Sequence, residues 1–427
     1  MRTRGRAVLA AATAAVTLTL AHPAGSAWAG NSRAQDPGWH VWPLGSGQDD
    51  QELRAVAALG PRDAWAVGYQ GDTGGGPPIV QHFDGTAWRN VPVSGHDGKG
   101  QFDAVLPVGP HDVWALGHWN DAAAYNDRAL AMHFDGRTWR ETPVPATPAN
   151  VSAYPFGAAA LGPSDVWMVG ATAVDRLDDA KPLAYHWDGQ TWTDVPTPDT
   201  GGHALLFAAA PDRAGGVWAV GVAYDANGAG RPLAERWDGQ AWRIVDVPHD
   251  ADKAYSLEGV TVLAPDDVWA VGSVSTAVGA SQPLAYHWDG RTWTRAAMPA
   301  VDGTLHGVSG ERGDVWAVGE RADATNKALT MRWDGRTWQE VAAAPETGVS
   351  LFSVAVVPGA RPGRASVWAV GSTLPSLQLP WHAVIEGFGA APASAPMVSA
   401  PTGTAAGGPT GTTVRAGQRA GRVAVGR

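Results

Sequence analysis

The sequence repeats one short motif seven times. The motif is DVWAVG or a close variant, and its tryptophans lie 47–53 residues apart, at Trp65, Trp114, Trp167, Trp218, Trp269, Trp316 and Trp368. A second motif follows each of the first six copies, as in YHWDGQTW and YHWDGRTW. A regular period of this length indicates many copies of one supersecondary unit, packed against one another. The chain is therefore expected to fold as seven similar units.

Each unit is predicted to contain four short strands. In the fifth unit, an apolar run at 257–263 leads through a polar turn into DVWAVG, and the runs PLAYHW and TWTRA follow. The Asp-Gly pair between the last two runs predicts a type I′ hairpin turn, because its residues tolerate positive φ. Four-stranded antiparallel units repeated around an axis are the blades of a β-propeller. The predicted fold class is all-β, a seven-bladed β-propeller.

The ends of the repeat region complement each other. The seventh unit ends after its third strand, at 382–389, and an extra strand precedes the first unit at 38–47. In that extra strand, Trp39 and Pro43 match Trp139 and Pro143 of a complete unit. We predict that the N-terminal strand completes the seventh blade, which would remove an exposed strand edge.

These repeats, from 38 to 389, resemble those of secreted bacterial seven-bladed propellers. The D-G-x-T-W element is similar to the Asp-box of sialidase-like propellers, although it is one residue shorter. It is also similar to the W-D-G…W repeat of bacterial propeller lectins, which bind fucose-type sugars between blades. The loop before this element is longer here than in those lectins, so the resemblance implies the fold but no pocket geometry.

The two ends of the chain have their own composition. Arg2, Arg4 and Arg6 precede an apolar run, and Ala27-Trp28-Ala29 is an A-x-A cleavage site, which together predict a Sec-type signal peptide over 1–29. An uncleaved anchor is the alternative. The domain is then 30–389, and the protein is expected to be secreted and extracellular. Residues 390–427, rich in Ala, Pro, Gly and Thr, predict a disordered tail, with contact to acidic wall polymers as the alternative.

Composition excludes several classes of function. Residues 30–389 contain all 41 acidic but only 24 basic residues, which disfavours nucleic-acid partners because phosphate binding needs a basic surface. No stretch beyond the leader predicts a membrane span. The absence of cysteine excludes disulfides, thiolate zinc sites and cysteine nucleophiles. Without any hydrolase, metalloprotease or nucleotide-binding motif, we assign no catalytic residue and no cofactor.

The tryptophans are predicted to form the core. Of the 21 beyond the leader, 18 occupy equivalent repeat positions, as expected for large side chains packed between blades. Trp42, Trp119 and Trp381 break the register. Trp119 and Trp381 lie in or beside the loop between second and third strands, and we predict them as stacking platforms for a ligand, with packing as the alternative.

The repeated polar residues are interpreted as structural. His82, His133, His186 and His287 share one strand position, but sheets packed about 10 Å apart cannot bring one residue per blade to a single ion. No metal site is therefore predicted, although calcium at the acidic loop 175–181 remains an alternative. The aspartates of the Asp-Gly pairs are expected to bond their own turn backbone. Arg312-Gly313-Asp314 spells an adhesion tripeptide but coincides with the repeat's own turn.

One position of the inner strand varies from unit to unit. Counted back from the DVWAVG turn, with an allowance for length changes in the sixth and seventh units, it is Arg54, Asp103, Phe156, Phe207, Glu258, His306 and Phe352. This position faces the end of the propeller that carries the long, dissimilar loops, where function tends to lie. We predict a polar binding site at the channel mouth made by Arg54, Asp103, Glu258 and His306. The alternative is that these are solvated strand-end residues.

Three functions remain open at this stage. The first is a secreted, non-enzymatic recognition module for cell-surface glycan or another polysaccharide. The second is a secreted polysaccharide hydrolase or lyase, with Asp103, Glu258 and His306 as acid–base groups at the channel mouth. The third is an extracellular protein–protein scaffold that uses the variable face. The sequence does not identify the ligand or the oligomeric state.

Overall fold

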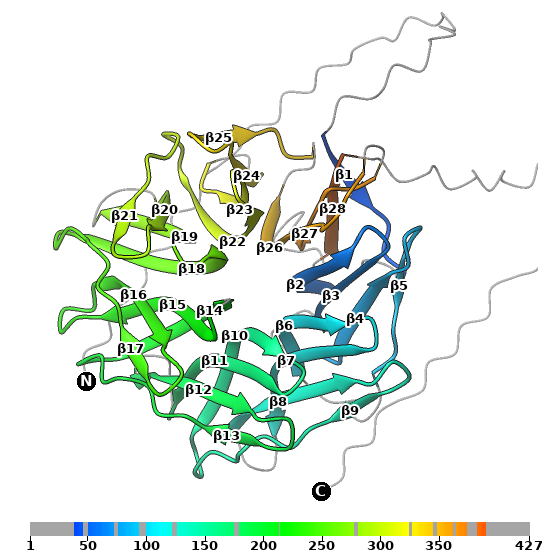
Figure 1. Cartoon of the computed structure of the whole chain (residues 1–427), viewed down its shortest axis with the longest axis horizontal. Helices are drawn as coiled ribbons and strands as arrows, with labels where there is room; N and C mark the ends of the chain where they lie inside the picture. The colour runs from blue at the N-terminus through cyan, green and yellow to red at the C-terminus, as the bar shows by residue number, and fades with distance from the viewer. Residues whose placement is uncertain are drawn as a thin grey trace, which may run out of the picture. The chain divides into compact units, whose positions relative to one another are not determined.

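The computed structural model describes residues 38–389, apart from 46–49, 72–75, 94–99, 122–125, 175–178, 213, 277–280, 324–326, 345–347, 362–363 and 374–381. This part of the chain forms seven four-stranded antiparallel sheets. The sheets surround a central axis like the blades of a propeller (Figure 1). The prediction of an all-β, seven-bladed β-propeller is confirmed. The predicted signal peptide and tail lie outside the described residues.

Six blades run outward in chain order, from an inner strand at the axis to a short outer strand. The inner strands are β2 (Gln51–Gly60), β6 (Gly100–Gly109), β10 (Ser152–Gly162), β14 (Ala204–Asp212), β18 (Lys253–Ala264) and β22 (Gly303–Glu311). The second strands contain the DVWAVG motif and are β3 (Asp63–Gln70), β7 (Asp112–Asp121), β11 (Asp165–Ala173), β15 (Gly216–Tyr224), β19 (Asp267–Thr276) and β23 (Asp314–Arg321).

The outer halves of these blades come from the second motif. The third strands are β4 (Pro78–Phe83), β8 (Asn126–Phe134), β12 (Lys181–Trp187), β16 (Gly230–Trp237), β20 (Gln282–Trp288) and β24 (Ala328–Trp333). The outer strands are β5 (Trp88–Asn90), β9 (Trp139–Glu141), β13 (Trp192–Asp194), β17 (Trp242–Ile244), β21 (Trp293–Arg295) and β25 (Trp338–Val341).

The seventh blade combines the two ends of the repeat region. Its strand order is β1-β28-β27-β26, with β26 (Val349–Val356), β27 (Val367–Thr373) and β28 (His382–Phe388) from the C-terminal side. The N-terminal strand β1 (Trp39–Trp42) pairs antiparallel with β28, so that Trp39 faces Phe388 and Trp42 faces Ile385. The outer position of this blade is thus occupied by a strand from the other end of the repeat region.

A ring of tryptophan pairs forms the core between blades. The tryptophan of each DVWAVG strand contacts the outer-strand tryptophan of the next blade, as Trp167 does with Trp242 at a ring-centre distance of 5.3 Å. In the seventh blade Trp39 is the outer-strand tryptophan, and its ring centre lies 5.6 Å from that of Trp316. All fourteen of these tryptophans are buried, which confirms that they belong to the core. Of the other four repeated tryptophans, Trp288 is buried, whereas Trp187, Trp237 and Trp333 are partly buried. Buried indole rings in edge contact add stability beyond the area that they remove from water.

The Asp-Gly turn differs from its predicted form. In the third blade Trp187 pairs with Trp192, so the loop has four residues, whereas a type I′ hairpin loop has two. Only the glycine adopts positive φ, at 94° for Gly189. The Oδ1 of Asp188 accepts hydrogen bonds from the backbone N–H groups of Gln190 and Thr191, both at 2.8 Å. The side chain therefore organises a longer turn, and the prediction that these aspartates bond their own backbone is correct.

The described residues contain no helix that is long and apolar enough to cross a membrane.

Candidate functional site

Each inner strand contains a one-residue β-bulge at the same place. In β22, Leu305 pairs with Gly319 and Gly307 pairs with Val318, which leaves His306 without a partner in the ladder. The other six inner strands have the same irregularity, and it always falls on the variable ring position: Arg54, Asp103, Phe156, Phe207, Glu258 and Phe352. A bulge redirects the side chain of the extra residue. Seven equivalent bulges therefore set up one ring of side chains.

The repeat glycine makes this bulge possible. A Cβ on Gly319 would lie 1.9 Å from the carbonyl oxygen of Thr304, and the equivalent glycine of every other blade meets a carbonyl at 1.8–2.1 Å. The residue after the bulge is also small, because neighbouring inner strands converge at the axis. A Cβ on Gly307, for example, would lie 2.9 Å from the Cα of Ser353. The last residue of DVWAVG is thus fixed as glycine by the bulge opposite it.

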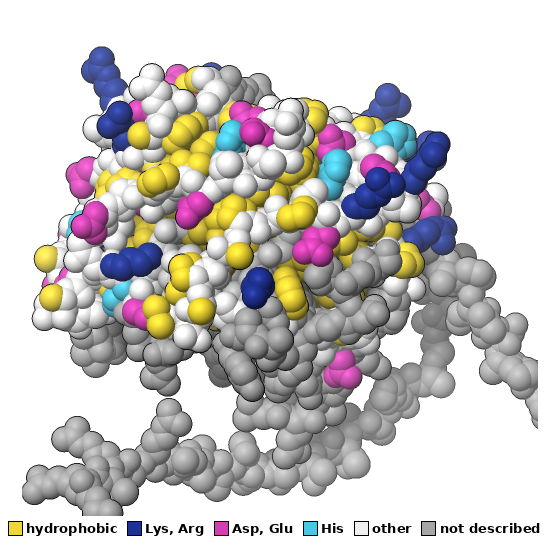
Figure 2. All heavy atoms as spheres, turned by 90° about the horizontal axis from the view of Figure 1, so that it is seen from below, with side chains coloured by type: hydrophobic (Ala, Val, Ile, Leu, Met, Phe, Trp, Pro, Cys, Tyr) yellow, Lys and Arg dark blue, Asp and Glu magenta, His cyan; other side chains and the backbone are white. Residues whose placement is uncertain are grey.

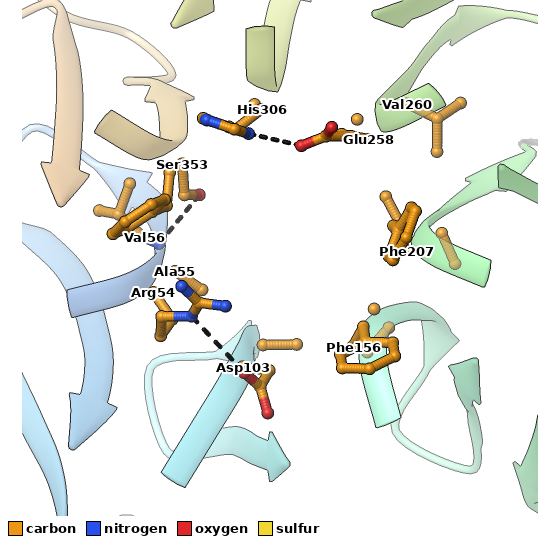
Figure 3. A pocket seen from close by; sticks show the side chains of 18 of the residues that line it. Arg54, Ala55, Val56, Asp103, Phe156, Phe207, Glu258, Val260, His306 and Ser353 are labelled. Carbon is orange, nitrogen blue, oxygen red and sulfur yellow. Dashed lines mark hydrogen bonds and ion pairs between the residues drawn. The ribbon is translucent and has the colours of Figure 1, made fainter. Parts of the chain in front are cut away.

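All seven ring residues line one cavity on the propeller axis, with a volume of about 500 Å³. Volumes of about 300–1,000 Å³ are usual for ligand pockets. Around the ring, Asp103 and Glu258 flank the pair Phe156 and Phe207, while Arg54 and His306 lie on the opposite side (Figure 3). We call this the axial cavity. Below the ring its wall consists of small and aliphatic residues, such as Ala55, Val56 and Val260.

Arg54 is held by two acidic residues and one ring. Its Nη1 donates to Oε1 of Glu52 at 2.9 Å, and its Nε lies 3.7 Å from Oδ1 of Asp103. Its guanidinium lies 4.8 Å from the centre of the Phe352 ring, within reach of a cation–π contact. Burial lowers the pKa of Arg54, but the charges of Asp103 and Glu52 raise it by more, so the net shift is upward. Arg54 is a fixed, neutralised cation.

Glu258 and His306 form a close pair across neighbouring blades. Nδ1 of His306 lies 2.5 Å from Oε2 of Glu258, as the dashed line in Figure 3 shows. The Nε2 of His306 is buried and makes no hydrogen bond to the described residues. A carboxylate on one ring nitrogen fixes the orientation of an imidazole.

The other side of the axial cavity is aromatic. The rings of Phe156 and Phe207 lie 5.8 Å apart and face the open space of the cavity (Figure 3). Tyr154 lies parallel to Phe156, at an interplanar angle of 7° and a distance of 6.3 Å. Both phenylalanines are only partly buried. They offer apolar surface to a ligand bound on the axis.

Sequence reasoning missed two polar residues beside the ring. Glu52 is buried, binds Arg54 and accepts a hydrogen bond from Ser372 of the seventh blade at 3.1 Å. His118 places Nδ1 3.2 Å from Oδ2 of Asp103. Glu52 lies two residues before Arg54 on the same strand, which was a usable signal. His118 comes from the second strand, where no repeat position marks it.

Of the two tryptophans predicted as stacking platforms, only Trp119 lies among the described residues. Trp119 lies on β7, partly buried, and packs against the hydrophobic core between the first and second blades. It is not among the residues that line the axial cavity. Trp381 lies outside the described residues.

The repeated histidines are paired within their own blades. Nε2 of His186 lies 2.9 Å from Oδ1 of Asp165, which also accepts a hydrogen bond from Nε1 of Trp167 at 3.0 Å. In the fourth and sixth blades an arginine takes the place of the histidine, as in the contact between Arg236 and Asp212. No group of three or more His, Asp or Glu side chains among the described residues could hold a metal ion.

Surface charge outside the axial cavity is mixed. On the side of the molecule drawn in Figure 2, acidic and basic side chains are interspersed with hydrophobic ones. Binding to a polyanion such as nucleic acid would require a continuous basic region. The view in Figure 2 offers none over the described residues.

Comparison with known proteins yields similarity of fold alone. No protein-family model and no curated protein matches the chain. Among solved structures, the chain is similar to PL25 ulvan lyase, a polysaccharide lyase, bound to -[GlcA(1-4)Rha3S]-, with a TM-score of 0.54, 11% identity, and coverage of 82% of this chain and 96% of that chain. It is also similar to YCF48 bound to D1 peptide, with a TM-score of 0.50, 13% identity, and coverage of 86% and 98%. Identities this low establish the propeller architecture but no shared activity.

Proposed function

We propose that this protein is a secreted, non-enzymatic recognition module whose axial cavity binds one unit of a cell-surface glycan or another polysaccharide. The observation that carries the proposal is the composition of the ring. Phe156 and Phe207 offer apolar ring surface, and Asp103, Glu258 and His306 offer hydrogen-bonding groups in the same cavity. A sugar has both kinds of surface, because its C–H faces are apolar and its hydroxyl groups are polar. Concave sites with few, well-placed polar groups are typical of small-ligand binding.

The fold comparison adds a precedent. A propeller of the same architecture, PL25 ulvan lyase, is known bound to -[GlcA(1-4)Rha3S]-. A signal peptide, as the sequence predicts, would place the cavity outside the cell, where polysaccharides are the abundant polymers. The ring closed by β1 supplies a rigid support for the binding groups.

The proposal is tested with a glycan array and titration calorimetry on the full mature chain. Phe207→Ala should weaken binding at least tenfold, a loss of about 1.4 kcal/mol, with little change in melting temperature. The matched control is Ile244→Ala, an exposed apolar residue on the outer strand β17, which should bind normally. If no glycan binds, or if Phe207→Ala binds as well as the wild type, the proposal is wrong.

A second candidate function rests on the Glu258–His306 pair. A carboxylate that orients a histidine in the wall of a cavity is the arrangement of a general base. The protein would then cleave a polysaccharide by hydrolysis or elimination. Product release from a broad polysaccharide panel, abolished by His306→Gln, would favour this candidate. Tight binding without any cleavage would leave the recognition module.

A further inference from the structure

The axial cavity offers a ligand more negative than positive charge. Among the described residues that line it, Arg54 is the one permanent cation, and it already binds the buried carboxylate of Glu52 and lies close to Asp103. Its guanidinium also lies 4.8 Å from the centre of the Phe352 ring. An acidic ligand would therefore meet a neutralised guanidinium together with the carboxylates of Asp103 and Glu258. Like charges in a cavity with restricted solvent repel more strongly than in water.

Asp103 places a buried carboxylate in the wall of the axial cavity. Its side chain is 4% exposed, and Oδ1 accepts a hydrogen bond from Nε2 of Gln101 at 2.6 Å. Oδ2 accepts no hydrogen bond from the described residues, although Nδ1 of His118 lies 3.2 Å away. Oδ2 is buried and faces His118, so Asp103 acts on a ligand in the axial cavity through its charge rather than through a hydrogen bond from Oδ2.

The position of the aromatic pair adds a second, independent argument. Phe156 and Phe207 come from consecutive blades, with Asp103 on the blade before them and Glu258 on the blade after them. Figure 3 shows both rings between the two carboxylates, across the cavity from Arg54 and His306. Aromatic faces attract a cation through the ring quadrupole. Two such rings flanked by two carboxylates have the chemistry that binds an ammonium group.

We propose that the sugar unit bound in the axial cavity carries a free primary amine, as in a polysaccharide of de-N-acetylated amino sugars. The ammonium group lies against Phe156 and Phe207, between the carboxylates of Asp103 and Glu258. This inference rests on the proposed glycan-binding function and names its ligand class. An N-acetyl group in the same place loses the charge and places an apolar methyl beside two carboxylates.

The test compares three tetrasaccharides by titration calorimetry on the full mature chain. The probes are a β-1,4-glucosamine oligomer, the same oligomer fully N-acetylated, and an oligogalacturonate. We expect the amine form to bind at least tenfold more tightly than either of the others. Its affinity should also fall as salt rises from low to physiological concentration.

Single substitutions then test which carboxylates are responsible for the preference for the amine form. Glu258→Gln should reduce the preference for the amine form at least fivefold, whereas Glu311→Gln should leave it unchanged, because Glu311 is an exposed acid on the far end of β22. Asp103→Asn should have the same effect as Glu258→Gln, provided that its melting temperature shows an intact fold. Wild-type affinity of Glu258→Gln for the amine form overturns the inference.

The outcomes separate the inference from the proposed function. Equal or tighter binding of the N-acetylated or acidic oligomer overturns the amine assignment and leaves glycan binding intact. Failure of all three oligomers also overturns it, and the glycan array then decides whether the proposed function falls as well. Tighter binding of a lysine-rich peptide than of any glycan would make a protein the partner and would overturn both.

Discussion

Gly319 of β23 lies opposite the bulge that turns His306 of β22 into the axial cavity. The two residues are linked through the backbone, because a Cβ on Gly319 would lie 1.9 Å from the carbonyl oxygen of Thr304 and 2.8 Å from the Cα of Leu305. The bulge brings the inner strand this close. A glycine in a repeat motif therefore determines where a candidate binding residue points.

This relationship predicts a large effect for Gly319→Ala. The added methyl group cannot be accommodated without moving the backbone of β22, and overpacking of this kind costs about 1–3 kcal/mol. We expect a clear drop in melting temperature and loss of any binding that depends on His306. The matched control is Gly162→Ala, where a Cβ meets nothing within 4 Å. Equal melting temperatures for the two variants would contradict this account of the bulge.

The ring illustrates what the sequence could and could not reveal. Counting back from DVWAVG identified all seven ring residues of the axial cavity, because the distance from turn to bulge is constant in the first five blades and only the sixth and seventh needed an allowance for a change in length. The bulge itself has no sequence signature apart from the glycine on the neighbouring strand. Glu52 and His118 were missed because their contacts cross strands and blades. The four-residue Asp-Gly turn was misjudged because the aspartate side chain, rather than its φ, organises the loop.

Because β1 is the outer strand of the seventh blade, we expect that removal of residues 30–46 exposes the edge of β28. The truncated chain loses Trp39, which contacts Trp316, and Trp42, which lies 5.0 Å from Trp368. The backbone of β28 would then be free to pair with another chain. We expect a lower melting temperature and association detected by light scattering. Removal of 30–37 alone keeps β1 and should have neither effect. A monomeric 30–46 deletion of wild-type stability would show that β1 is dispensable.

Trp167 and Trp119 should differ in their contribution to stability. Trp167 is buried and contacts Trp237 and Trp242 of the next blade, so Trp167→Ala should lower the free energy of unfolding by about 3–5 kcal/mol. Trp119 is only partly buried, so Trp119→Ala should cost less than half as much. Denaturant unfolding followed by fluorescence measures both. A similar, large loss at both positions would make Trp119 a core residue and remove the case for a stacking platform.

Because of Glu235, we expect the free energy of unfolding to fall as pH rises. Its side chain is fully buried in the blade core, and neither carboxylate oxygen has a hydrogen-bond partner among the described residues. Burial raises its pKa from 4.5 to about 8. The folded state therefore keeps a proton that the unfolded state loses, and stability declines from about pH 4.5 to about pH 8.

Glu235→Gln should remove that decline. At pH 8 the variant should be more stable than the wild type by a few kcal/mol, since each pKa unit corresponds to about 1.4 kcal/mol. Near pH 4.5 the two proteins should be similar. Urea unfolding at several pH values measures the difference, with Glu311→Gln as the exposed control. Parallel pH profiles for Glu235→Gln and the wild type would show that the carboxylate is not held neutral.

Arg54 is expected to be needed for the fold as well as for the cavity. The substitution Arg54→Met removes the guanidinium and leaves the carboxylates of Glu52 and Asp103 buried without their cation. Breaking a buried ion pair on one side costs about 3–5 kcal/mol, and we expect the lower end because the side chain of Arg54 is 34% exposed. Adding Glu52→Gln and Asp103→Asn to the same chain should restore much of the loss, because the unpaired charges are then gone. Denaturant unfolding of the single and triple variants measures this coupling. If Arg54→Met is as stable as the wild type but no longer binds glycan, then Arg54 is a ligand group rather than the counter-ion that holds these two acids.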